Sequence, residues 1–272
     1  MEKYYDAYGD KEWHRWEGSP ADEVKLHVHR YWLERYVRRG DFVLEVGAGP
    51  GRFTQVLAQL GARIVVVDLS PVQLDLNRRH ALELGFDEAV EGRLQLDLCE
   101  MGALKDETFD VVVCYGGPLS YVFDRRDVAV QEVFRVLRPS GKALFGVMSL
   151  WGSVHQFLPD VMRVPIEENA EIIGTGDLHP DTYGACQHQN HMFRASELRM
   201  LLEQHGATVL AMSASNCLSA AWGDRLTEAR QDPAHWQELL DYEIQACQEP
   251  GCLDLGTHLI AVAKKRDVEL MR

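Results

Sequence analysis

The chain has 272 residues, of which 46% are apolar, and 28 Lys and Arg against 42 Asp and Glu give a formal net charge of −14. This length accommodates one large domain with an elaboration, or two small domains. The negative charge repels polyphosphate and anionic lipid, so it disfavours nucleic-acid and membrane binding and favours a neutral or cationic small-molecule partner.

The first sixteen residues carry charges throughout and are not typical of a secretory signal. The longest apolar runs, near 109–115 and 143–151, are far shorter than the roughly 20 residues of a membrane span. We therefore expect a cytoplasmic protein that is a monomer or a homodimer. Its six scattered cysteines are expected to be free thiols in a reducing compartment.

Strand-like and helix-like segments alternate through the first half of the chain. Residues 21–39 have helical spacing, end at Gly40 and complete an N-terminal arm over 1–39. Expected strands then cover 42–47, 63–70, 93–98, 109–117 and 142–150. The helices expected between them cover 52–60, 71–84 and 125–137. Continuous apolar strands that alternate with helices predict a parallel sheet covered on both faces.

The alternation stops after residue 150. An insert over 151–194 is rich in His, Gly, Pro and Asp and lacks clear periodicity. The pattern then resumes with expected elements at 195–205, 207–213, 224–247 and 257–265. We predict an α/β fold with a seven-stranded, mostly parallel, Rossmann-like sheet whose last strand is antiparallel. Residues 40–150 and 195–272 would belong to one core domain.

The segment VLEVGAGPGRF (43–53) places Gly47, Gly49 and Gly51 between a strand and a helix. Glycines let the backbone turn sharply and let a ligand lie against it. The spacing G-x-G-x-G differs from the dinucleotide pattern G-x-G-x-x-G, and the loop lacks the Lys of a phosphate-binding loop. A tight turn that binds no ligand is the alternative interpretation of the loop alone.

Polar or small residues follow the next three strands as well. Asp68 ends the second strand, Asp97 the third, and Tyr115-Gly116-Gly117 the fourth. Open parallel sheets bind ligands at the carboxyl ends of their strands, and a carboxylate beside a glycine loop accepts ribose hydroxyls. Four strand ends in register favour a ligand site over four unrelated caps or solvated acids.

With these motifs the chain resembles the class I S-adenosylmethionine-dependent methyltransferases, most of all the small-molecule branch with the ubiquinone/menaquinone-type enzymes. VLEVGAGPGRF, VVVDLS, LQLDL and FDVVVCYGG resemble that family's first four motifs, and EVFRVLRPSGKALF resembles the helix–turn–strand that follows. The resemblance is strong over 40–150 and weak over 195–265. It implies methyl transfer to a small-molecule acceptor, with S-adenosylhomocysteine as the product.

The resemblance also assigns cofactor-binding residues. Around the methionine part it places Glu45, Gly47, Ala48, Gly49 and Gly51. Around the ribose and adenine it places Asp68, Leu69, Asp97 and Leu98. Near the transferable methyl it places Tyr115 and Gly116, although the fourth motif lacks the acid or Asn that the family pattern contains.

The acceptor site is expected in the parts of the chain without a matching motif. The arm 1–39 is predicted to close over the site and the insert 151–194 to cap it, since loops at this sheet edge commonly carry specificity. Candidate pocket residues are Tyr5, Tyr8 and Trp151, and candidate catalytic residues are His29, His155, His179 and Tyr115. No metal is expected, because Cys186-x-His188-x-x-His191 is too short a set for a zinc site.

Two other functions stay open at this point. The first is a protein of the same fold that binds the cofactor, or nothing, and acts as a partner or scaffold. The second is a nicotinamide-dependent oxidoreductase, which the glycine spacing disfavours.

Overall fold

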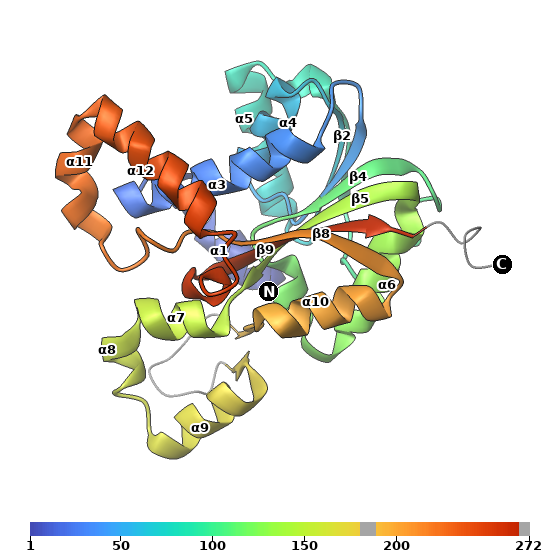
Figure 1. Ribbon diagram of the computed structural model, residues 1–272. Coiled ribbons are helices and arrows are strands. Elements are labelled where there is room, and N and C mark those ends of the chain that lie inside the picture. Colours follow the sequence, from blue (N-terminus) through green and yellow to red (C-terminus); the bar gives the residue numbers. More distant parts are fainter. Residues whose placement is uncertain (180–188, 267–272) are drawn as a thin grey trace.

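A seven-stranded sheet forms the centre of the computed structural model, which describes residues 1–179 and 189–266. The strand order is β3-β2-β1-β4-β5-β9-β8, and Figure 1 shows the sheet running through the molecule between two layers of helices. Neighbouring strands from β3 to β5 are parallel, whereas β9 is antiparallel to both β5 and β8. The predicted fold class, including the antiparallel last strand, is confirmed.

The strands of the sheet are β1 (Phe42–Val46), β2 (Arg63–Asp68), β3 (Val90–Gln95), β4 (Phe109–Cys114), β5 (Leu137–Met148), β8 (Ala207–Ala214) and β9 (His258–Lys265). Side chains of successive residues point to opposite faces. In β4, Val111 and Val113 pack into one hydrophobic core, and Val112 and Cys114 pack into the other. Burial on both faces is why these strands read as continuous apolar runs.

Two sets of helices cover the two faces. One core receives residues from α3 (Pro20–Tyr36), α4 (Arg52–Gln59), α5 (Pro71–Leu84) and α12 (Pro233–Ala246). The other core receives residues from α6 (Arg126–Val136) and α10 (Ala195–Gln204). Because β1, β2, β3 and β4 are parallel, the loops that follow them lie at one edge of the sheet.

Several boundaries differ from the predicted ones. The third strand covers Val90–Gln95 rather than 93–98, so Asp97 lies in the loop beyond it. The fifth strand begins at Leu137, before the predicted turn at Pro139-Ser140-Gly141. That turn is an irregularity within β5: Ser140 has a φ of +61°, and the register with β4 shifts between the pairs Phe109–Leu137 and Val111–Lys142. The expected helical stretch 224–247 is divided into η4 (Gly223–Leu226), α11 (Thr227–Gln231) and α12, with Pro233 at the start of α12.

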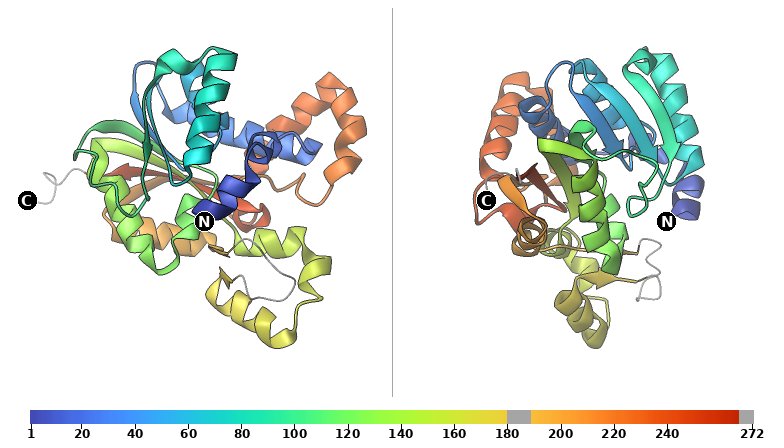
Figure 2. Two further views of the ribbon diagram at one scale, coloured as in Figure 1. Left: turned by 180° about the vertical axis from the view of Figure 1, so that it is seen from behind. Right: turned by 90° about the vertical axis from the view of Figure 1, so that its right-hand side faces the viewer.

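The N-terminal arm contains two short helices that the sequence pattern did not predict, α1 (Glu2–Tyr8) and α2 (Lys11–His14). Figure 2 shows this arm in front of the sheet edge, next to α5, and contacts between α1 and α5 agree with that view. The arm therefore lies near the carboxyl ends of β1 and β2.

The insert contains regular structure despite its weak periodicity. It forms α7 (Leu150–Gln156), α8 (Leu158–Val161), α9 (Ile166–Thr175) and the short pair β6 (Asp177–Leu178) and β7 (Asn190–His191). In Figures 1 and 2, α8 and α9 project from the body of the molecule on the side of α10. Short one- to three-turn helices contain too few residues to display a clear hydrophobic period.

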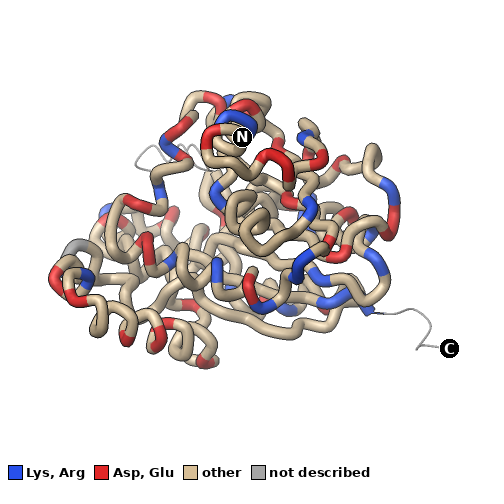
Figure 3. The backbone as a smooth tube through the Cα atoms, turned by 90° about the horizontal axis from the view of Figure 1, so that it is seen from above, with Lys and Arg blue, Asp and Glu red and all other residues tan. Residues whose placement is uncertain are grey.

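Charge is distributed over the surface rather than concentrated. In the view of Figure 3, acidic and basic residues are interspersed along the chain. None of the helices in the described ranges combines the length and the apolar character that crossing a membrane requires.

Candidate functional site

A cavity of about 310 Å³ lies at the carboxyl ends of β1, β2 and β4. The loop after β1 forms its floor through Gly47, Ala48 and Gly49. Gly47 has a φ of +67°, and a Cβ there would lie 2.3 Å from Cγ of Pro118, so no larger residue fits. Gly49 has a φ of +53° and also lines the cavity. The loop thus presents bare backbone to a ligand.

Asp68 provides a fixed carboxylate beside that loop. Its Oδ2 accepts a hydrogen bond from the Gly49 amide at 2.8 Å, and its Oδ1 accepts one from the Ser70 amide at 2.9 Å. Burial raises the pKa of this carboxyl, and the backbone hydrogen bonds oppose the rise. Each oxygen keeps a further lone pair, so the carboxylate is held in place to accept two hydroxyl groups.

Three leucines make part of the cavity wall apolar. Leu69, Leu96 and Leu98 line it together with Asp97. Asp97 accepts from the Cys99 amide at 2.7 Å and faces the Arg125 guanidinium at 3.4 Å. Apolar leucine side chains beside one carboxylate acceptor suit an aromatic ring that bears an amine.

Tyr115 and Gly116 complete the wall at the end of β4. Tyr115 is 2% exposed, and its hydroxyl is buried without a hydrogen-bond partner among the described residues. Its ring packs against His29 and Phe53 in the core, with 4.9 and 5.2 Å between ring centroids.

Glu45 lies behind the glycine loop and does not line the cavity. It is 2% exposed and accepts a hydrogen bond from the Thr54 hydroxyl at 2.6 Å. Burial raises the pKa of its carboxyl to about 8, and the nearby Asp68 carboxylate adds to the rise, while the Thr54 hydrogen bond opposes it. Gly51 likewise lies outside the cavity lining and forms the N-cap of α4.

We predict that Glu45 makes stability depend on pH. Its folded pKa of about 8 exceeds the ordinary value of 4.5, so the folded state holds a proton that the unfolded chain releases between these values. The stabilisation is therefore complete below pH 4.5 and is lost as pH rises through about 8. Over this pH range the free energy of unfolding of the wild type should therefore fall by roughly 3–5 kcal/mol because of Glu45. In Glu45→Gln, whose side chain stays neutral, this fall should be absent.

Urea unfolding across this pH range, without ligand, measures the effect. Glu83→Gln, at an exposed position of α5, is the matched control and should follow the wild-type curve. Parallel curves for the wild type and Glu45→Gln would show that Glu45 is ionised in the folded protein.

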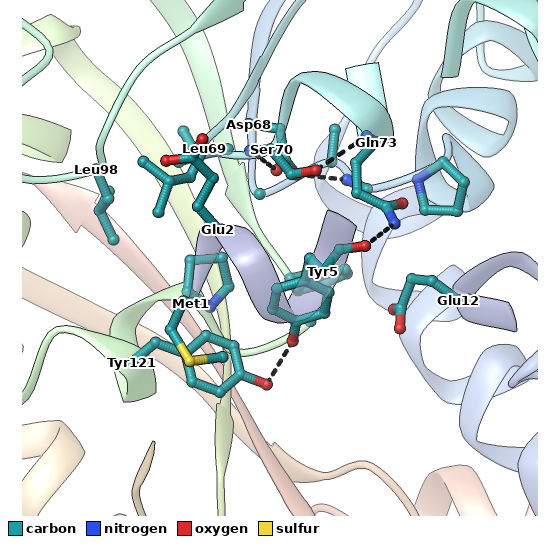
Figure 4. A pocket seen from close by; sticks show the side chains of 18 of the residues that line it. Met1, Glu2, Tyr5, Glu12, Asp68, Leu69, Ser70, Gln73, Leu98 and Tyr121 are labelled. Carbon is teal, nitrogen blue, oxygen red and sulfur yellow. Dashed lines mark hydrogen bonds between the residues drawn. The ribbon is translucent and has the colours of Figure 1, made fainter. Parts of the chain in front are cut away.

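The N-terminal arm covers the cavity (Figure 4). Tyr5 of α1 lines it, and its hydroxyl donates to the Tyr121 hydroxyl at 2.8 Å. The Gln73 side-chain amide donates to the carbonyls of Tyr5 and Gly9, at 2.9 and 3.1 Å. The Ser70 hydroxyl donates to Asp6 at 2.5 Å. The start of α5 thus holds α1 across the opening.

Three charged residues of the arm that sequence reasoning missed also line the cavity: Glu2, Glu12 and Arg15. Arg15 pairs with Glu12 at 2.8 Å, and the Arg15 guanidinium stacks on Trp16 with 4.6 Å between its central carbon and the ring centroid. Burial raises the pKa of Glu12, and the adjacent Arg15 opposes the rise. The usable signal was the spacing of three between Glu12 and Arg15 among aromatics in a charged segment.

The other predicted pocket residues lie elsewhere. His29 is buried behind the cavity wall, 4.9 Å from Tyr115 between ring centroids, and burial lowers its pKa to about 4. His155 is exposed on α7, and His179 is exposed and stacks on Phe123. Tyr8 stacks on Tyr4, and Trp151 is 43% exposed beside Arg194. The structure brings none of these five side chains into the cavity lining.

Of the Cys186-x-His188-x-x-His191 motif, only His191 lies within the described residues, and it forms ion pairs. Cys186 and His188 lie outside the described residues. His191 is buried between two carboxylates, 2.7 Å from Asp177 and 2.8 Å from Glu197. These bonds tie the base of the insert to α10.

Comparisons with known proteins agree with this geometry. Residues 44–145 match the family model described as a methyltransferase domain. The chain is 31% identical over 141 residues to a ubiquinone biosynthesis O-methyltransferase of Pseudomonas entomophila, which covers 50% of this chain and 59% of that protein. A mitochondrial ubiquinone biosynthesis O-methyltransferase of Schizosaccharomyces pombe is 28% identical over 51% of this chain and 52% of its own length. The chain thus matches only about half of the length of these curated relatives.

Solved structures share the fold at low sequence identity. A 1,6-didemethyltoxoflavin-N1-methyltransferase of Burkholderia thailandensis, solved with 1,6-didemethyltoxoflavin and S-adenosylhomocysteine, has a TM-score of 0.57 at 17% identity over 98% of this chain and 87% of its own. A putative methyltransferase complexed with the Trm112 activator of Haloferax volcanii has a TM-score of 0.60 at 16% identity, over 95% of this chain and 96% of the matched chain.

Proposed function

We propose that this chain is a class I S-adenosylmethionine-dependent methyltransferase, as its match to a methyltransferase domain over residues 44–145 supports, and that it transfers the methyl group of S-adenosylmethionine to a small-molecule acceptor. One observation carries the proposal: a bare glycine loop and a carboxylate fixed by two backbone amides share one cavity at the carboxyl edge of the sheet. The named activities of the ubiquinone-type relatives support a small acceptor.

The lining residues fit the three parts of this cofactor. We assign the ribose to Asp68, and the adenine to Leu69, Leu98 and Asp97. The methionine end would lie on Gly47 to Gly49, within reach of the charged pair Glu12 and Arg15. Carboxylate and ammonium groups of an amino acid need partners of both signs, and this pair supplies both.

The cofactor brings a methyl group on a sulfonium, which is already a good leaving group. The residues of this chain then have to align the acceptor and exclude water. Tyr115 and Gly116 stand at the wall that we assign to the methyl end, and Tyr5 and Tyr121 cover it. No histidine of the described ranges lines the cavity, so we propose that alignment, rather than histidine base catalysis, drives transfer.

We further propose that the arm 1–39 acts as a lid and that the insert 151–194 caps the acceptor. Gln189, from the insert, lines the same cavity as Tyr5 of the arm, which supports a shared acceptor region. A cytoplasmic location and a monomeric or homodimeric state remain part of the proposal. Size-exclusion chromatography with light scattering measures the second.

Asp68→Ala tests the cofactor assignment. Loss of the charged acceptor should weaken S-adenosylmethionine binding by about 10- to 100-fold, the scale of hydrogen bonds to an ionised group. Isothermal titration calorimetry with S-adenosylmethionine and with NAD measures it. Asp75→Ala, at an exposed position of α5, should retain wild-type affinity.

A screen of small acceptors with labelled methyl donor then tests transfer itself. Label in a product extracted from the reaction supports the enzyme. Tight NAD binding, or equal S-adenosylmethionine affinity for Asp68→Ala and the wild type, would contradict the proposal.

A further inference from the structure

A second cluster of chemically active side chains lies beside β8, an edge strand of the sheet. Cys217 is in the loop after β8, Glu243 is in the last turn of α12, and Cys247 directly follows α12. Their two sulfurs and the nearest carboxylate oxygen all lie within 4.8 Å of one another. None of the three lines the cavity described above. This group, the Cys217–Glu243–Cys247 cluster, therefore belongs to a separate site.

The carboxyl group of this cluster is fully buried. Glu243 is 0% exposed, and its oxygens accept hydrogen bonds from the backbone amides of Cys217, Leu218 and Ser219. Among the described residues, no Lys, Arg or His forms an ion pair with it within 4.0 Å. Buried carboxylates in proteins are usually paired or coordinate metals, and a metal ion would supply the positive charge that no side chain of the described residues supplies here.

The separation of two of these ligand atoms is compatible with zinc. The Cys247 sulfur lies 3.5 Å from Oε1 of Glu243. Tetrahedral zinc, with a Zn–S bond of about 2.3 Å and a Zn–O bond of about 2.0 Å, holds such ligand atoms roughly 3.5 Å apart. We propose that the Cys217–Glu243–Cys247 cluster binds one Zn²⁺ ion.

Cys252 contacts Cys217 but lies outside the group of three mutually close ligand atoms. Cys252 is only partly buried, so it gives the ion a route from solvent. Each thiol that coordinates the ion releases its proton to water, and the metal joins the end of α12 to the loop after β8.

A disulfide between Cys217 and Cys247 is the main alternative. It would remove the thiol hydrogen bond to Glu243 and leave the buried carboxylate without a cation. A zinc ion would bind both sulfurs and also neutralise the carboxylate. Soft thiolate ligands favour this metal. The arrangement therefore favours zinc over oxidation.

The test measures metal in the full-length protein, expressed with added zinc and passed through a desalting column. Mass spectrometry of the metal should find close to one zinc per chain. Cys217→Ser and Cys247→Ser should each lower it at least tenfold. Cys114→Ser, a fully buried thiol outside the cluster, is the matched control and should keep the wild-type content.

Chelation and cobalt substitution separate binding from misfolding. Removal of zinc should lower the Tm by roughly 10 °C, and added Zn²⁺ alone should restore it. Cobalt should produce thiolate charge-transfer absorption in the wild type and not in Cys217→Ser. Native mass spectrometry that finds no metal, or a Cys217–Cys247 disulfide in the zinc-supplemented protein, would overturn the proposal. These readouts do not depend on methyl transfer.

Discussion

Gly49→Arg is expected to abolish S-adenosylmethionine binding, with a loss of affinity greater than about a thousandfold, or ~4 kcal/mol. The first carbon of the new side chain is tolerated, because a Cβ at Gly49 would lie 3.6 Å from Cγ of Glu12 and 3.8 Å from Oε1 of Gln73. The remaining atoms have to enter the cavity that Gly49 lines. They would occupy the space that we assign to the methionine part of the cofactor.

The control has to reproduce the backbone strain. Gly85, at the end of α5, has a φ of +74° against +53° at Gly49, and no atom lies within 4 Å of its ideal Cβ. Gly85→Arg therefore carries a similar left-handed penalty of about 1–2 kcal/mol away from the cavity. Calorimetry should find wild-type affinity for this variant. Binding by Gly49→Arg at the wild-type level would show that the ligand lies elsewhere.

The cofactor half of the site follows from local sequence because the fold brings strand ends together. Gly47 and Gly49 follow β1 and Asp68 ends β2, and the parallel pairing of Val46 with Val67 places these ends side by side. The sequence also indicates Asp97, although β3 ends earlier than predicted. Once the order of parallel strands is known, such residues need no long-range information to be placed at one edge.

The arm and the second cluster escape this reasoning. Glu12 and Arg15 line the cavity because the arm packs across it, where Ser70 and Gln73 bind α1 and Trp16 packs on Phe53. Cys217 and Glu243 are 26 residues apart, which is unlike the short paired spacings that mark zinc sites in sequence. In both cases tertiary contacts bring the residues together, and the sequence patterns of the separate segments do not predict those contacts.

Deletion of residues 1–9 is expected to reduce turnover by about 10²-fold, the scale of an acceptor that is misplaced and exposed to water. The deletion removes Tyr5, which lines the cavity and donates to Tyr121, but it keeps Glu12 and Arg15. Affinity for S-adenosylmethionine should therefore fall less than turnover. The prediction depends on the proposed function, so it is measured with an acceptor identified in the labelled-methyl screen.

Two point variants separate the hydroxyl contact from the presence of α1. Tyr5→Phe keeps the ring in the cavity and removes only the bond to Tyr121, so its loss of turnover should be smaller than that of the deletion. Tyr8→Phe, on the same helix but outside the cavity lining, should match the wild type. Steady-state kinetics and calorimetry are compared for all three proteins. If the deletion retains wild-type turnover, α1 does not cover the reacting groups, and the acceptor has to be sought beside the insert instead.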